Sequence, residues 1–190
     1  MSSSVHTAQH RQAGFSLIEV SIVTAIVLLL AIISVPAIGA YVVENKVPKV
    51  GENLARYIMQ VKVNAPAGPE APFDGIATES FANMVRESSI FTVVGTGATA
   101  KVLHGLGSNG EVTIAEADAG AAFSVTLDKV HHAACPSIAS VLQRVSDRIT
   151  VAADGQSATT IKDSSTAYSA MVAESRCGKG DVNTFVFTAS

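Results

Sequence analysis

A charge-free apolar run near the N-terminus constrains the fold of this chain more than any other feature. Residues 20–43 contain no charged side chain, and the preceding letters, GFSLIEV, place a carboxylate at Glu19. As a helix rising about 1.5 Å per residue, residues 15–43 would be roughly 40 Å long, against about 30 Å for the hydrocarbon core of a bilayer. The sequence therefore predicts a helix that can span a membrane, in which an ionised Glu19 needs a counter-charge.

The residues in front of the run predict its orientation. Residues 1–14 hold His6, His10 and Arg11 but no acidic residue. Because positively charged flanks stay on the cytoplasmic side, we expect a cytoplasmic N-terminus and a C-terminal part on the other side of the membrane.

Two other interpretations of the run remain open. A cleaved secretory signal has an apolar stretch of about 7–15 residues, which is much shorter than this run, although Ala37-Ile38-Gly39 would suit its cleavage site. A plain membrane anchor would place Glu19 close enough to the cytoplasmic interface to reach water.

The remainder of the chain has the composition of a folded domain. Residues 44–190 carry 15 Asp and Glu against 12 Lys and Arg, spread along the sequence. No tract rich in Lys or Arg would neutralise a row of phosphates, so nucleic acid is an unlikely partner.

Cys135 and Cys177 are the only cysteines. In a domain predicted to lie in an oxidising compartment, an even number of cysteines favours one disulfide, and two buried thiols are the alternative. His131 and His132 lie close to Cys135 and raise the possibility of a metal or thiol-nucleophile site. Paired histidines at the end of a strand are more often surface residues, so we expect neither catalysis nor a bound metal there.

The pattern after the apolar run predicts an α+β domain. Apolar residues at helical spacing make residues 44–64 an amphipathic continuation of the first helix. Pro36 predicts a bend in that helix, and the Pro/Gly-rich residues 64–75 predict a loop. A short helix is expected from Thr78, where a hydroxyl can cap it. The apolar face of residues 44–64 comprises Val47, Val50, Leu54, Tyr57, Ile58 and Val61.

Alternating residues further on predict a mostly antiparallel sheet with helices laid on it. Residues 122–130 and 182–188 read as strands, and 148–153 and 159–162 form a hairpin about the turn Asp154-Gly155. Short helices are expected from Cys135, with Pro136 in the first turn, and around Tyr168.

The letters AGFSLIEVSIVTAIVLLLAIISVP resemble the N-terminus of a type IV prepilin. The shared features are a short hydrophilic leader ending in Gly14, then Phe15, Glu19, an apolar helix and Pro36. The two-cysteine α+β domain resembles that of the type IVb subgroup.

The resemblance implies roles for these residues. A prepilin peptidase would cut between Gly14 and Phe15 and methylate the new amino terminus of Phe15. Glu19 would pair with the Phe15 amine of a neighbouring subunit during assembly. The chain would then comprise a leader (1–14), a transmembrane and filament-core helix (15–43), its amphipathic continuation (44–64) and a globular pilin domain (65–190).

The resemblance also implies a structural role without catalysis, cofactor or metal. The precursor would lie in the inner membrane with its C-terminal domain in the periplasm, and the product would be a helical homo-oligomer outside the cell, serving adhesion, motility, aggregation or conjugation. An inner-membrane assembly platform, an ATPase and an outer-membrane secretin would be its partners. A minor pilin or type II secretion pseudopilin is one alternative, and a membrane-anchored periplasmic enzyme or binding protein is another.

Overall fold

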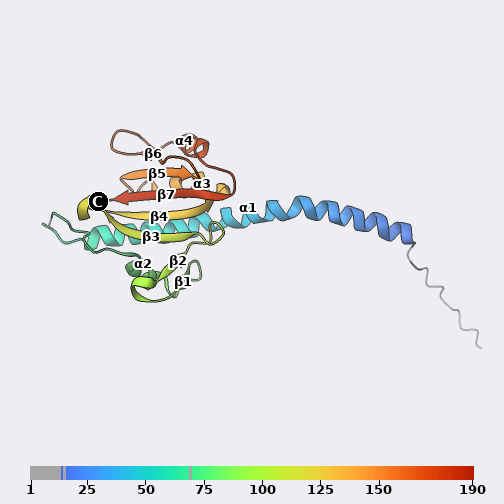
Figure 1. The fold of residues 1–190 in the computed structure, drawn as a ribbon, viewed down its shortest axis with the longest axis horizontal. Coiled ribbons are helices and arrows are strands. Elements are labelled where there is room, and N and C mark those ends of the chain that lie inside the picture. Colours follow the sequence, from blue (N-terminus) through green and yellow to red (C-terminus); the bar gives the residue numbers. More distant parts are fainter. Residues whose placement is uncertain (1–13, 15, 69) are drawn as a thin grey trace, which may run out of the picture. The chain divides into compact units, whose positions relative to one another are not determined.

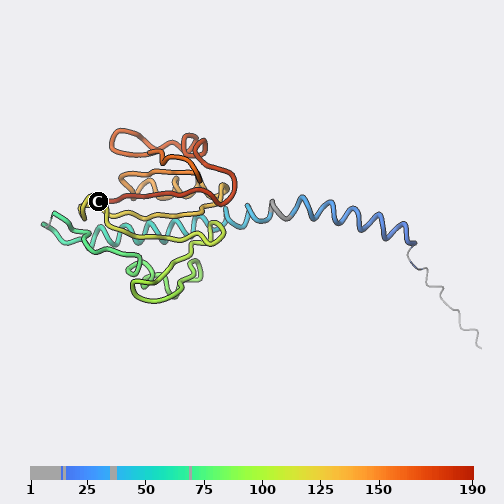
Figure 2. The backbone as a smooth tube through the Cα atoms, in the orientation of Figure 1, coloured from blue at the N-terminus to red at the C-terminus, as the bar shows by residue number. Residues whose placement is uncertain are grey.

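The computed structural model describes residues 14, 16–68 and 70–190, and for residues 35–37 it describes the backbone alone. The chain forms two compact units, with the boundary between Ile38 and Gly39. Figures 1 and 2 trace both units. The helix α1 (Leu17–Asn64) contributes residues to each of them. The predicted end of the helix at residue 64 is confirmed, and Pro66 follows shortly after, where helices commonly stop.

Within the unit Gly39–Ser190, one face of α1 is built into the core. Five of its six predicted apolar positions are no more than 3% exposed, and Val61 is partly buried against them. A Cβ atom at Gly51 would lie 2.6 Å from Cγ1 of Val141, so the missing side chain lets α1 and the helix α3 (Cys135–Leu142) approach closely. The five buried residues are Val47, Val50, Leu54, Tyr57 and Ile58.

The described strands form one seven-stranded sheet in the order β1-β2-β3-β4-β7-β5-β6, and every pairing is antiparallel. The predicted antiparallel sheet is therefore confirmed. The last strand along the chain lies in the middle of the sheet, between β4 and β5, as Figure 1 shows. The strands are β1 (Thr92–Val94), β2 (Lys101–Leu103), β3 (Glu111–Ala117), β4 (Ala122–His131), β5 (Arg148–Ala153), β6 (Thr159–Lys162) and β7 (Asp181–Ala189).

Three short α-helices and three one-turn 3-10 helices complete the described structure. The expected start at Thr78 is confirmed, but the expected cap is wrong. Ala77 occupies the N-cap position, and the Thr78 hydroxyl instead accepts a hydrogen bond from the backbone N–H of Ile114 at 3.0 Å. The elements are α2 (Thr78–Val85), α3 (Cys135–Leu142), α4 (Ala170–Ser175), η1 (Gly97–Thr99), η2 (Asp118–Gly120) and η3 (His132–Ala134).

The predicted disulfide is present. It joins Cys135, at the start of α3, to Cys177, just after α4, with the two Cα atoms 6.2 Å apart. Ala173 is the buried residue of α4, whereas Met171 is 79% exposed. The covalent link therefore holds a helix that buries little apolar surface of its own.

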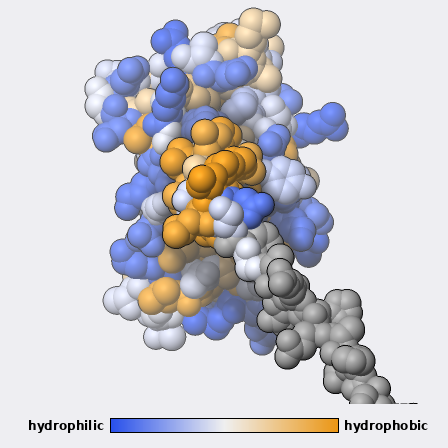
Figure 3. Space-filling model, turned by 90° about the vertical axis from the view of Figure 1, so that its right-hand side faces the viewer, coloured by the Kyte–Doolittle hydropathy of each residue, from blue (hydrophilic) through white to orange (hydrophobic). Residues whose placement is uncertain are grey.

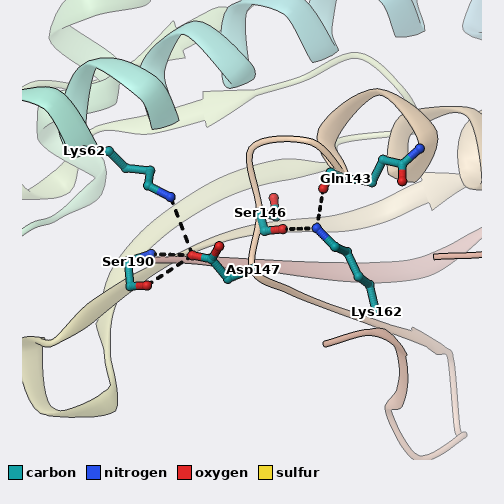
Figure 4. A network of polar contacts seen from close by, with 6 residues as sticks. All are labelled: Lys62, Gln143, Ser146, Asp147, Lys162 and Ser190. Atoms are coloured by element: carbon teal, nitrogen blue, oxygen red, sulfur yellow. Dashed lines mark hydrogen bonds and ion pairs between the residues drawn. The ribbon is translucent and has the colours of Figure 1, made fainter. Parts of the chain in front are cut away.

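A polar network ties the end of β7 to α1 and to the segment between α3 and β5 (Figure 4). One carboxylate oxygen of Asp147 accepts hydrogen bonds from the backbone N–H and the hydroxyl of Ser190, and lies 3.6 Å from the Lys62 ammonium. Charged donors near the C-terminal end of a helix satisfy carbonyls that have no partner within the helix. Lys162, on β6, supplies such a donor at the end of α3: its ammonium donates hydrogen bonds to the carbonyls of Gln143 and Ser146.

A buried histidine holds the loop between β2 and β3. The His104 side chain is fully buried, its Nε2 lies 2.8 Å from the backbone oxygen of Asp128, and its Nδ1 accepts the N–H of Leu106. The ring is therefore neutral, with its proton on Nε2. A Cβ atom at Gly107 would lie 1.9 Å from the carbonyl oxygen of Lys129, so no other residue fits there.

We expect the stability of the globular unit to fall in mild acid because of His104. Burial lowers the pKa of His104, and the Asp128 carbonyl and the carboxylates of Asp128 and Asp181 offset only part of this effect. The unfolded chain, with a histidine pKa of about 6.5, then binds more protons than the folded one. The contribution is fully present above that pH and is lost below it, by at most about 1.4 kcal/mol per pH unit until the folded pKa is reached.

Urea unfolding of the full chain in detergent, between about pH 7 and pH 5, measures this effect. His104→Gln keeps a donor and an acceptor but does not titrate, so its stability should depend less on pH. His132→Gln removes an exposed histidine and should behave like the original chain. Equal pH dependence in all three proteins would refute the assignment to His104.

Candidate functional site

The junction between Gly14 and residue 15 lies just outside the first helical turn. Gly14 and Ser16 are exposed and non-helical, and α1 begins at Leu17. Phe15 lies outside the described residues. Gly14 and Ser16 are therefore accessible and lie outside the regular helix.

The Glu19 side chain caps the N-terminal end of α1. Its carboxylate accepts the backbone N–H of Ser16 at 2.8 Å. Ser16 stands at the N-cap position and Glu19 three residues later, which is one half of a capping box, and a carboxylate is also favoured by the helix dipole in this turn. The Ser-x-x-Glu spacing of residues 16–19 is a known signal for this arrangement, but the sequence prediction did not use it.

Three hydroxyl side chains of the apolar run are satisfied inside the helix. Three hydroxyls, at 2.6–2.9 Å, donate to the carbonyl four residues earlier. Such bonds remove the cost of placing a hydroxyl in an apolar medium. Glu19 is therefore the one side chain of residues 15–43 that carries a charge at neutral pH. The three bonds join Ser21 to Leu17, Thr24 to Val20 and Ser34 to Leu30.

The part of α1 that precedes Gly39 exposes apolar side chains all around the helix. Its large aliphatic residues between 17 and 33 are each more than half exposed. In Figure 3, a group of hydrophobic residues, coloured orange, lies directly next to the residues drawn in grey. α1 is long and apolar enough to cross a membrane, with a mean hydropathy of 2.7 over its most apolar window. A helix that is apolar all around is covered by lipid or by other helices.

Two other predicted features have different outcomes. Helix α1 runs through position 36, but the side chain of Pro36 lies outside the description and the bend stays a prediction.

His132 is exposed, and the Nδ1 atom of His131 accepts the N–H of Ala133. Among the described residues, no cluster of three or more His, Cys, Asp or Glu side chains is placed to bind a metal ion. Cys135 is occupied by its disulfide.

Comparison with known families decides the identity. Residues 9–35 match the prokaryotic N-terminal methylation motif, and residues 107–190 match the family described as PilS N terminal. The chain is a type IV pilin. Pilins are structural proteins rather than enzymes, and the motif of this pilin implies processing by a peptidase and polymerisation into a pilus.

The fold of this pilin agrees with the type IVb subgroup. The crystal structure of a type IVb pilin from Salmonella typhi matches 73% of this chain and 94% of its own, with a TM-score of 0.50 and 20% sequence identity. At that identity the likeness concerns the fold. No curated protein matches the pilin by sequence.

Proposed function

We propose that this pilin is cut between Gly14 and Phe15, methylated at the Phe15 amine, and polymerised through its apolar helix. The observation that carries the proposal is the methylation motif over residues 9–35, which includes both residues. The exposed, non-helical Gly14 supports it, because a peptidase needs access to extended chain. The leader would be 1–14, the filament-core helix 15–43, its amphipathic continuation 44–64 and the globular domain 65–190.

Glu19 would have one partner before assembly and a stronger one after it. In the single chain, its carboxylate is satisfied by the N–H of Ser16. In a filament, the positively charged amine of Phe15 from a neighbouring subunit would pair with it, since a charge in apolar surroundings is costly without a counter-charge. This pairing would set the register of each incoming subunit.

The apolar helix would exchange lipid for neighbouring copies of itself. Lipid tails are as apolar as these side chains, so the hydrophobic effect gives little drive for extraction, and close packing and the Glu19 pair contribute instead. An ATPase at an inner-membrane platform would supply the remaining work, and an outer-membrane secretin would provide the exit. Before extraction, the N-terminus would be cytoplasmic and the globular unit periplasmic. Head-to-tail contacts that do not close would give a helical filament.

Intact mass and N-terminal sequencing of filaments sheared from cells test the proposal. The expected chain starts at N-methylated Phe15 and is lighter by two hydrogens because of the disulfide. Reduction of the same sample should restore those two hydrogens and leave the N-terminus unchanged. Sheared filaments whose chains begin at Met1 would refute the cleavage, and abundance in the sheared material would separate a major from a minor pilin.

A further inference from the structure

A cavity of about 400 Å³ lies in the unit Gly39–Ser190, between α1 and the loop that joins β2 to β3. Its lining includes none of residues 15–43 and no residue assigned to processing or assembly. Its lining combines cationic, neutral polar and small apolar groups. The lining residues are Lys46, Lys49, Ser89, Ile90, Thr92, Leu103, Gly105, Gly107, Asn109 and Gly110.

Two lysines that line this cavity form no ion pair among the described residues. Lys46 and Lys49 are exposed and three positions apart on α1, so their side chains lie on neighbouring parts of the helix surface. None of the ion pairs found in the described chain involves either residue. The lining contains no acidic residue. Two lysines without an ion pair among the described residues therefore line an acid-free cavity in a chain whose net charge is -3.

The loop between β2 and β3 forms the other wall of the cavity and is held in place by hydrogen bonds. The N–H of Ser108 donates to Asp181 and the N–H of Glu111 donates to Asp128, in addition to the contacts of His104 described above. Gly105 has a φ of +65°, and a Cβ atom there would lie 3.3 Å from the Lys46 ammonium nitrogen. Gly105 therefore lies against the end of the Lys46 side chain, and its left-handed backbone conformation favours glycine. Such a wall loses little conformational entropy when a ligand binds.

We propose that this cavity binds a sugar-sized molecule that carries a phosphate or carboxylate group. The two lysines match the charge of the oxyanion, and charge-assisted hydrogen bonds are the stronger kind. The hydroxyls of Ser89 and Thr92 and the amide of Asn109 can exchange hydrogen bonds with sugar hydroxyls. The volume lies within the range of about 300–1,000 Å³ typical of small-molecule sites.

Isothermal titration of the full chain in detergent tests the site with three probes. Glucose 6-phosphate carries a phosphate, glucuronic acid carries a carboxylate, and glucose carries neither. We expect saturable binding of at least one acidic probe and none of glucose. The double variant Lys46→Gln/Lys49→Gln should weaken that binding by about tenfold or more, because a hydrogen bond to a charged group contributes about 1.5–3 kcal/mol.

Lys179→Gln is the matched control, since Lys179 is exposed and lies outside the cavity. It should change the affinity less than about twofold. Circular dichroism of all variants checks that the fold is intact. Absence of saturable binding by both acidic probes would overturn the proposal, as would equal binding of glucose or unchanged affinity in the double variant. These outcomes do not depend on cleavage at Gly14, so the site and the proposed function can fail separately.

Discussion

Glu19→Ala should lower the yield of sheared filaments by about tenfold or more, while the precursor is still inserted and processed. The variant removes the only charged side chain of residues 15–43 and with it the proposed pair with the Phe15 amine of a neighbour. Hydrogen bonds to charged groups contribute about 1.5–3 kcal/mol each, and the loss repeats at every subunit. Quantitative immunoblotting of sheared and membrane fractions measures both forms.

Glu19→Gln separates the charge from the helix cap. Glutamine can still accept the N–H of Ser16, since Glu and Gln both serve in a capping box, but it cannot pair with an amine as a charge. If the charge pair drives assembly, the glutamine variant should fail nearly as severely as the alanine variant. Filament yields at the original level with glutamine would show that the cap, rather than the charge, is what assembly requires.

Removal of the disulfide should produce the largest loss of stability in the globular unit. Cys135 and Cys177 are 42 positions apart, and closing a loop of that length contributes roughly 4 kcal/mol on the chain-entropy account. The double variant Cys135→Ala/Cys177→Ala should therefore unfold at a markedly lower urea concentration. The double variant is used because a single replacement would leave a free thiol.

Reductant provides the control for this experiment. Treatment with a reducing agent should shift the unfolding midpoint of the original chain toward that of the double variant, and should leave the double variant unchanged. The effect should be strongest around α4, where Ala173 is buried but Met171 is exposed. A midpoint that neither the variant nor the reductant shifts would contradict a stabilising disulfide.

Periodicity made the local elements of this fold predictable. The stripe from Val47 to Ile58 indicated the buried face of α1, because residues three or four apart share one side of a helix. Pro136 placed the start of α3, and the turn Asp154-Gly155 placed the hairpin of β5 and β6. In each case the signal and the structure lie within a few residues of each other.

The features that escaped prediction depend on contacts between distant residues. The Thr78 hydroxyl bonds 36 positions away to Ile114 instead of capping its own helix. His104 reaches Asp128, 24 positions away, and its burial has no local signature. Strand β1 has only three residues, too few for alternation to be visible. At the candidate site, the Ser16–Glu19 contact was within reach of the sequence, whereas the lysine-lined cavity required the folded loop.

The central place of β7 sets an order of events for folding. Strand β7, residues 181–189, is synthesised after the other six strands of this sheet, yet it alone joins the β1–β4 part of the sheet to the β5–β6 part. Until they arrive, the facing backbone edges of β4 and β5 have no partner, and exposed edges invite pairing with other chains. A nascent chain stalled before residue 181 would therefore expose one unpaired strand edge on each part of the sheet. Synthesis of β7 covers both edges and so protects the chain against aggregation.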